Sequence, residues 1–88
     1  MNGDTKAHAR LLLESNKTDE ATKLLQSLPK DAETLYLLGR LNWKKGNIAK
    51  AISYFEEASI LEPGGEATQA LEMAREVMDF YNKDMYNP

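Results

Sequence analysis

The stretch from residue 35 to residue 63 reads LYLLGRLNWKKGNIAKAISYFEEASILEP and contains a clear turn signal, Gly46-Asn47. After this turn, small and apolar side chains recur every three to four residues, as they do along one face of an α-helix. Before it, residues 31–45 are apolar nearly all round. Glycine suits the left-handed turn that ends a helix, and asparagine can cap the next helix. The stretch therefore predicts two helices joined by a tight turn.

Turn signals of the same kind divide the whole chain. Its turn signals are Asn16-Lys17, Pro29, Gly46-Asn47 and Pro63-Gly64-Gly65, and they separate five segments of helix length. No segment alternates apolar and polar residues with a period of two, so no strand is expected. A helix that is apolar on two faces needs neighbours on both, which places residues 31–45 inside a stack. The prediction is a single all-α domain of five helices over residues 1–88.

An internal repeat gives this stack its architecture. The motif Ala9-Arg10-Leu11 returns as Gly39-Arg40-Leu41, and Met73-Ala74-Arg75 aligns with the same segment. Each repeat is therefore predicted to be an antiparallel helical hairpin, and the last has only its first helix.

The middle repeat carries a family resemblance. Its spacing is Leu35-x2-Leu38-Gly39 followed by Ala51-x3-Phe55-x2-Ala58-x4-Pro63. This pattern resembles the tetratricopeptide repeat, although Leu35 and Asn42 stand where that family often has Trp and Tyr. The resemblance implies a short right-handed superhelix with a degenerate first repeat (1–30), a well-matched repeat (31–65), and a capping helix with a tail (66–88).

Composition excludes several classes of protein. The 88 residues include no cysteine, so disulfides and thiolate metal sites are absent. A net charge of −3 argues against a nucleic-acid surface, and the chain has neither a membrane span nor a signal-peptide core. The expectation is a cytoplasmic protein that binds neither nucleic acid nor membranes.

Catalysis and metal binding have little support in the sequence. The only histidine, His8, aligns with packing positions of the other repeats and has no nearby metal ligands at helical spacing. No phosphate loop or nucleophile motif occurs. We therefore expect no catalytic residue, no metal and no cofactor, and hence not an enzyme.

The three arginines suggest a binding surface, because each follows the small residue of its repeat. The resemblance implies that this side of each first helix lines a concave groove. The candidate groove residues are Lys6, Arg10, Tyr36, Arg40, Trp43, Lys44 and Arg75. Guanidinium groups bind carboxylates, and Trp and Tyr are favoured anchors. The predicted function is a non-catalytic adaptor that holds an extended acidic or C-terminal peptide of a partner protein.

Two alternatives remain open. Arg10 and Arg75 can pair with Glu14 and Asp79 on their own helices and simply be solvated. The second functional interpretation is a structural role, with self-association or docking through the C-terminal helix and tail. If residues 82–88 fold back to cover Phe80, the protein is expected to be a monomer; otherwise a weak homodimer is the alternative.

Overall fold

Residues 2–86 form five helices, which confirm the predicted all-α class. The computed structural model describes residues 2–86, with side chains over residues 5–79. The helices are α1 (Asn2–Glu14), α2 (Thr18–Gln26), α3 (Ala32–Lys44), α4 (Ile48–Leu61) and α5 (Glu66–Tyr86). No strand occurs within residues 2–86.

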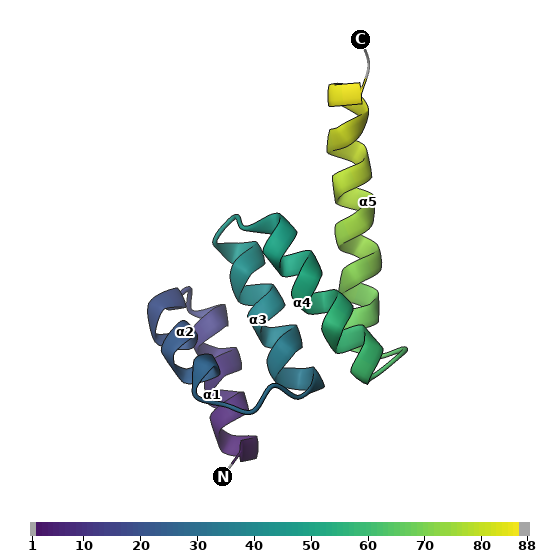
Figure 1. The fold of residues 1–88 in the computed structure, drawn as a ribbon. Coiled ribbons are helices and arrows are strands. Elements are labelled where there is room, and N and C mark those ends of the chain that lie inside the picture. Colours follow the sequence, from purple (N-terminus) through teal and green to yellow (C-terminus); the bar gives the residue numbers. More distant parts are fainter. Residues whose placement is uncertain (1, 87–88) are drawn as a thin grey trace.

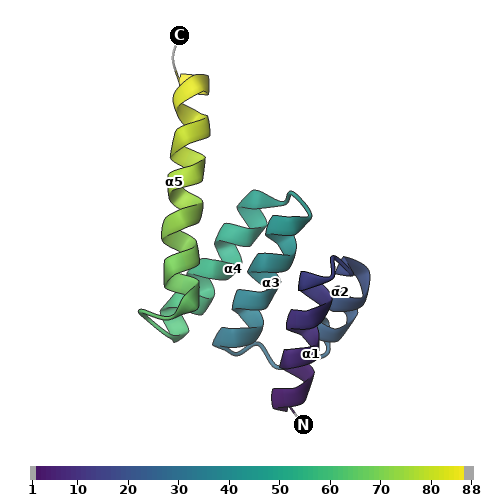
Figure 2. The same cartoon turned by 180° about the vertical axis from the view of Figure 1, so that it is seen from behind.

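The helices form two hairpins and a final single helix (Figures 1 and 2). The α1–α2 hairpin stacks against the α3–α4 hairpin, and the first half of α5 packs against α4. The second half of α5 extends beyond the rest of the array in both views. The molecule is therefore elongated, with extents of 52 × 27 × 16 Å. No helix of the described chain combines the length and the hydropathy needed to cross a membrane.

The turns within the two hairpins have the same backbone conformation and the same backbone hydrogen bonds. Gly46 and Asn16 both have a positive φ, 85° and 61°. In each turn the next amide reaches back to a carbonyl five residues earlier: Lys17 N donates to Leu12 O at 2.8 Å, and Asn47 N to Asn42 O at 2.9 Å. This is the Schellman arrangement, in which a left-handed residue closes the end of a helix. The internal repeat is thus a repeat of backbone geometry, although only one of the two turns has glycine.

Asn47 occupies the N-cap position of α4, as predicted, but its side chain does not cap the helix. Its side chain makes no hydrogen bond to the start of that helix. Instead, Nδ2 of Asn47 donates to Oδ1 of Asn42 at 3.4 Å, and Nδ2 of Asn42 donates to the Leu38 carbonyl at 2.8 Å. Asn42 is buried, so this chain of amides satisfies a polar side chain inside the turn. The amide that departs from the tetratricopeptide pattern is therefore used to hold α3 to the start of α4.

Helix α3 lies between two layers, as its sequence predicts. Leu37, Leu38 and Leu41 join the core formed by α1 and α2. On the other side, Leu35 packs with Ala58 and Ala67 from α4 and α5. Small residues lie where α3 faces its neighbours. The small residues there, Gly39, Ala51 and Ala58, are all buried.

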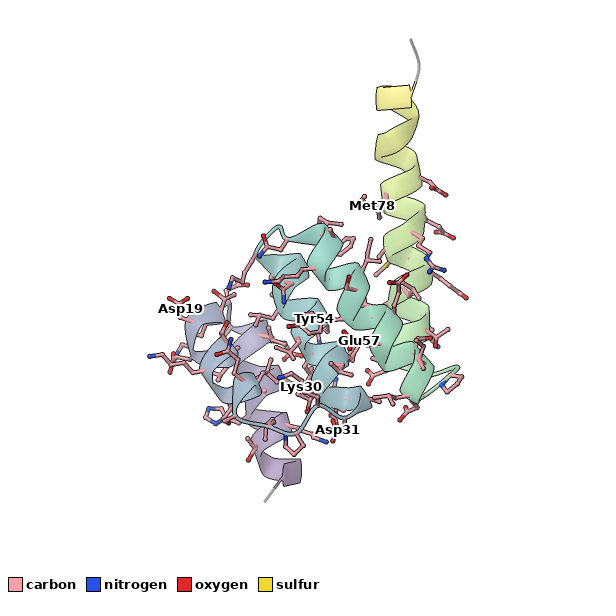
Figure 3. All side chains as sticks on the ribbon, viewed as in Figure 1. Asp19, Lys30, Asp31, Tyr54, Glu57 and Met78 are labelled. Carbon is pink, nitrogen blue, oxygen red and sulfur yellow. The ribbon has the colours of Figure 1, made fainter. Side chains whose placement is uncertain are left out.

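Asp31 caps α3 and lies at the start of this helix in Figure 3. Its Oδ1 accepts from the Thr34 amide at 2.9 Å, and its Oδ2 accepts from Lys6 of α1. Partial burial opposes ionisation of this carboxyl, but the hydrogen bonds from Lys6 and the Thr34 amide outweigh it. The pKa of Asp31 therefore lies below its ordinary value of 3.8.

This lowered pKa predicts a loss of stability in acid. The ionised carboxylate stabilises the fold fully above pH 3.8, and that contribution disappears as the pH falls through the lower pKa of the native state. Asp31→Asn keeps a favoured cap but removes the charge. Urea unfolding between pH 2 and pH 7 should show a smaller acid-dependent loss in this variant than in wild type. Asp19→Asn, at an exposed acid of α2 without an ion pair among residues 5–79, is the matched control. Parallel curves for Asp31→Asn and wild type would contradict the assignment.

The end of α5 differs from the sequence expectation. The backbone continues as helix to Tyr86, so residues 82–86 do not turn back toward the array. The side chain of Phe80, for which cover was expected, lies outside the described side chains. The physical reason for the continuous helix is simple, since residues 66–86 contain no glycine or proline that would end it.

Candidate functional site

A cavity of about 260 Å³ opens between α3 and α5, with Phe55 of α4 at its base. Its lining, which we call the α3–α5 groove, consists of Tyr36, Arg40, Trp43, Lys44, Phe55, Ala70 and Met73. The four residues from α3 are four of the seven candidates named from the sequence. They share this wall because spacings of three and four residues lie on one side of a helix. The structure therefore brings together the predicted group around Arg40.

Tyr36 is the centre of this surface. The guanidinium carbon of Arg40 lies 5.9 Å from the centre of its ring, and that of Arg10 lies 5.7 Å away. The ring also meets Phe55 in a tilted arrangement, with the centroids 6.0 Å apart. These contacts are favourable for a partly buried aromatic ring and restrict its motion. Tyr36 is thus a rigid platform on which Arg40 is held beside the groove.

The groove carries positive charge that no acidic side chain of the described residues neutralises. Arg40 makes no ion pair with any side chain of residues 5–79. Lys44 donates to the neutral side chain of Asn16 at 3.2 Å and keeps its charge at the rim. Between them, Trp43 is half-buried, and Met73 across the groove is 60% exposed. An apolar wall with unpaired cations beside it is suited to a ligand that has both a carboxylate and an apolar side chain.

Two other predicted candidates are already bound to acids of the protein itself. Arg10 donates to Glu66 of α5 at 2.9 Å and to Glu33 of α3 at 3.2 Å. The hydrogen bond to Glu66 raises the pKa of Arg10 above its ordinary value, although partial burial acts against this. Lys6 pairs with Asp31 and lies 3.8 Å from Glu33. Arg10 and Lys6 therefore join α1 to α3 and α5 and do not lie free in the α3–α5 groove.

The predicted row of three arginines does not form, because Arg75 faces another way. Arg75 donates to Glu56 of α4 at 3.0 Å and does not line the groove. Met73 faces the groove, and two further residues along a helix turn a side chain by about 200°. The alignment of the internal repeats placed Arg75 correctly after a buried alanine. It also assumed that α5 is rotated about its own axis in the same way as α3, and this is not the case. The expected intrahelical partners Glu14 and Asp79 are likewise replaced by acids of other helices.

Sequence reasoning missed the α5 side of the groove and the acids around Arg10. Met73 gave a signal, since it lies off the main apolar stripe of its helix. Nothing in local spacing indicated Glu66, which is 56 residues from its partner Arg10. The expectation for His8 was also wrong, because its side chain is exposed rather than packed. Within the described part of the chain, no group of three or more His, Asp or Glu side chains is arranged to hold a metal ion.

Comparison with known proteins places this helical array in a family. The family model described as "Nucleoporin Nup120, HEAT repeats" matches residues 7–87, which is nearly the whole chain. No curated protein and no solved structure matches the chain. The match confirms the predicted class, a helical-repeat protein, while the tetratricopeptide assignment itself stays a prediction. From its stacked hairpins and from this match, the chain belongs to the HEAT-repeat family of nucleoporin Nup120.

Proposed function

We propose that this protein is a non-catalytic interaction module that holds an extended acidic or C-terminal segment of a partner protein in the α3–α5 groove. Helical-repeat families serve as protein-interaction and scaffold modules, and this supports a protein as the partner. The observation that carries the proposal is the guanidinium of Arg40, which has no acidic partner among the side chains of residues 5–79 and is held on Tyr36 beside the apolar side chains of Trp43 and Met73. The cytoplasmic location and the tetratricopeptide-like register of the middle repeat are retained as predictions.

The groove offers its own reporter for this test. Trp43 is the only tryptophan of the chain, so a bound peptide changes the protein's intrinsic fluorescence directly at the proposed site. We expect Arg40→Ala to weaken binding of an acidic peptide about three- to tenfold, because a partly exposed charge-assisted hydrogen bond is lost. Binding by wild type should also weaken as salt rises.

Arg75→Ala is the matched control, since it removes the same side chain from the other side of α5. It should leave the affinity unchanged. Amidation of the peptide's C-terminus separates recognition of the terminal carboxylate from recognition of acidic side chains. If Arg75→Ala weakens binding as much as Arg40→Ala, or if basic peptides change Trp43 fluorescence as strongly as acidic ones, the proposal is wrong.

A structural role through α5 is the second candidate function. It is favoured by the exposure of Met73 and by the extension of α5 beyond the array. Light scattering distinguishes the two. A monomer leaves Met73 available to a peptide, whereas a dimer that Met73→Glu dissociates supports self-association through this helix.

A further inference from the structure

We infer that the segment bound in the α3–α5 groove carries charges of both signs, with an acidic side at Arg40 and Lys44 and a basic side toward Glu62 and Glu66. This inference rests on the proposed function and adds the charge pattern of the ligand. It differs from the sequence expectation of an acidic peptide, because that expectation counted Arg10 as a free cation.

The groove continues past Tyr36 into an acidic hollow. A cavity of about 210 Å³ is lined by Arg10, Glu33, Glu62 and Glu66, together with Tyr36. Tyr36 also lines the α3–α5 groove, so this residue borders both cavities. A further hollow, lined by Tyr36, Glu66, Gln69 and Met73, joins them along α5. The three hollows share lining residues and are therefore neighbours, and together they mark a path along α3 and α5.

The charge changes sign along this path. At its acidic end, Glu33 and Glu66 both pair with Arg10, and Glu33 also lies 3.8 Å from Lys6, which pairs with Asp31. Glu62 makes no ion pair within residues 5–79. Four carboxylates (Asp31, Glu33, Glu62 and Glu66) against two cations (Lys6 and Arg10) leave an excess of two negative charges. At the other end, Arg40 and Lys44 supply two positive charges without an acidic partner among the same residues. A wholly acidic segment that followed the whole path would meet repulsion beside Glu62, whereas a lysine or arginine there would be attracted.

The length of the path sets the spacing of the ligand's charges. Glu33 and Lys44 are both on α3, and eleven residues of helix measure about 16 Å. An extended chain covers this distance in roughly five residues. The ligand is thus a short segment whose groups follow the path from Arg40 and Lys44 toward Glu62. An acidic group comes first, then an apolar side chain that contacts Trp43 and Met73, and then a basic group.

The test uses a capped peptide with two aspartates, alanine, phenylalanine, alanine and two lysines. Capping removes the terminal charges. The peptide is made with its sequence in the forward and in the reverse order, and the version that binds more tightly is compared with its acid-only counterpart. In the acid-only peptide both lysines are replaced by serine. Trp43 fluorescence should report affinity about three- to tenfold higher for the mixed-charge peptide, since each exposed ion pair contributes up to a few-fold.

Glu62→Lys should remove or reverse this preference, because it places a positive charge at the acidic end of the path. The fold should not be disturbed, since Glu62 makes no ion pair within the described side chains. Glu57→Lys is the matched control: this exposed residue of α4, labelled in Figure 3, lines none of the three hollows, and the preference should persist. If the acid-only peptide binds through Arg40 as tightly as the mixed-charge peptide, the inference is overturned and the proposed function stands. If neither peptide changes Trp43 fluorescence, both are overturned.

Discussion

Leu37→Ala is expected to lower the free energy of unfolding by about 2–5 kcal/mol, the usual cost of deleting a fully buried leucine and leaving a cavity. Leu37 is 0% exposed and joins α3 to the core of the α1–α2 hairpin. A domain of this size has a total stability of roughly 4–13 kcal/mol. The substitution therefore removes a large fraction of it. Urea denaturation followed by circular dichroism measures the loss.

Leu61→Ala provides the comparison, because this leucine is the last residue of α4 and is 58% exposed. A change within about 0.5 kcal/mol is expected there, as for most surface substitutions. Equal losses for the two variants would mean that α3 is not enclosed by the first hairpin, and the stacking of the two repeats would have to be revised.

The fold was predictable because its signals are local. Turn residues and helical periodicity each depend on a few neighbouring positions, and these gave five helices, two hairpins and an enclosed α3. The turn at Asn16 shows the limit of such signals: it has the same geometry as the turn at Gly46 without the glycine. Asparagine is the other residue that enters the left-handed region readily, so the weaker signal still marked the right place.

The groove was predictable on one helix and not between helices. Tyr36, Arg40, Trp43 and Lys44 share a wall because helical geometry alone fixes their relative positions. The roles of Arg10 and Arg75 depend on how α1, α4 and α5 are rotated against their neighbours, and spacing within a helix does not contain that rotation. The pairing of Arg10 with Glu66 joins the first and last helices, so it follows only from the complete packing.

Gly39→Val is expected to destabilise the protein by about 1–3 kcal/mol, the cost of overpacking a close helix crossing. A Cβ atom at Gly39 would lie 2.5 Å from Cδ1 of Phe55, well inside van der Waals contact. Phe55 is only 3% exposed and packs among Ala51, Leu71 and Ala74, so its ring can move away only toward the α3–α5 groove and at the expense of these contacts. Thermal unfolding followed by circular dichroism should show a lower midpoint. Ala49→Val, at an exposed position of α4, should cost only a few tenths of a kcal/mol.

A double-mutant cycle with Phe55→Leu identifies the cause of this loss. If the valine acts by striking the Phe55 ring, a smaller residue at position 55 gives it room, and the double variant should be more stable than the sum of the two single changes predicts. A coupling of about 1 kcal/mol or more is expected for residues in direct contact. Additive losses would contradict the contact and would place the crossing of α3 and α4 in a different register. Because the Phe55 ring also forms the base of the α3–α5 groove, the same two single variants should alter Trp43 fluorescence, whereas Ala49→Val should not.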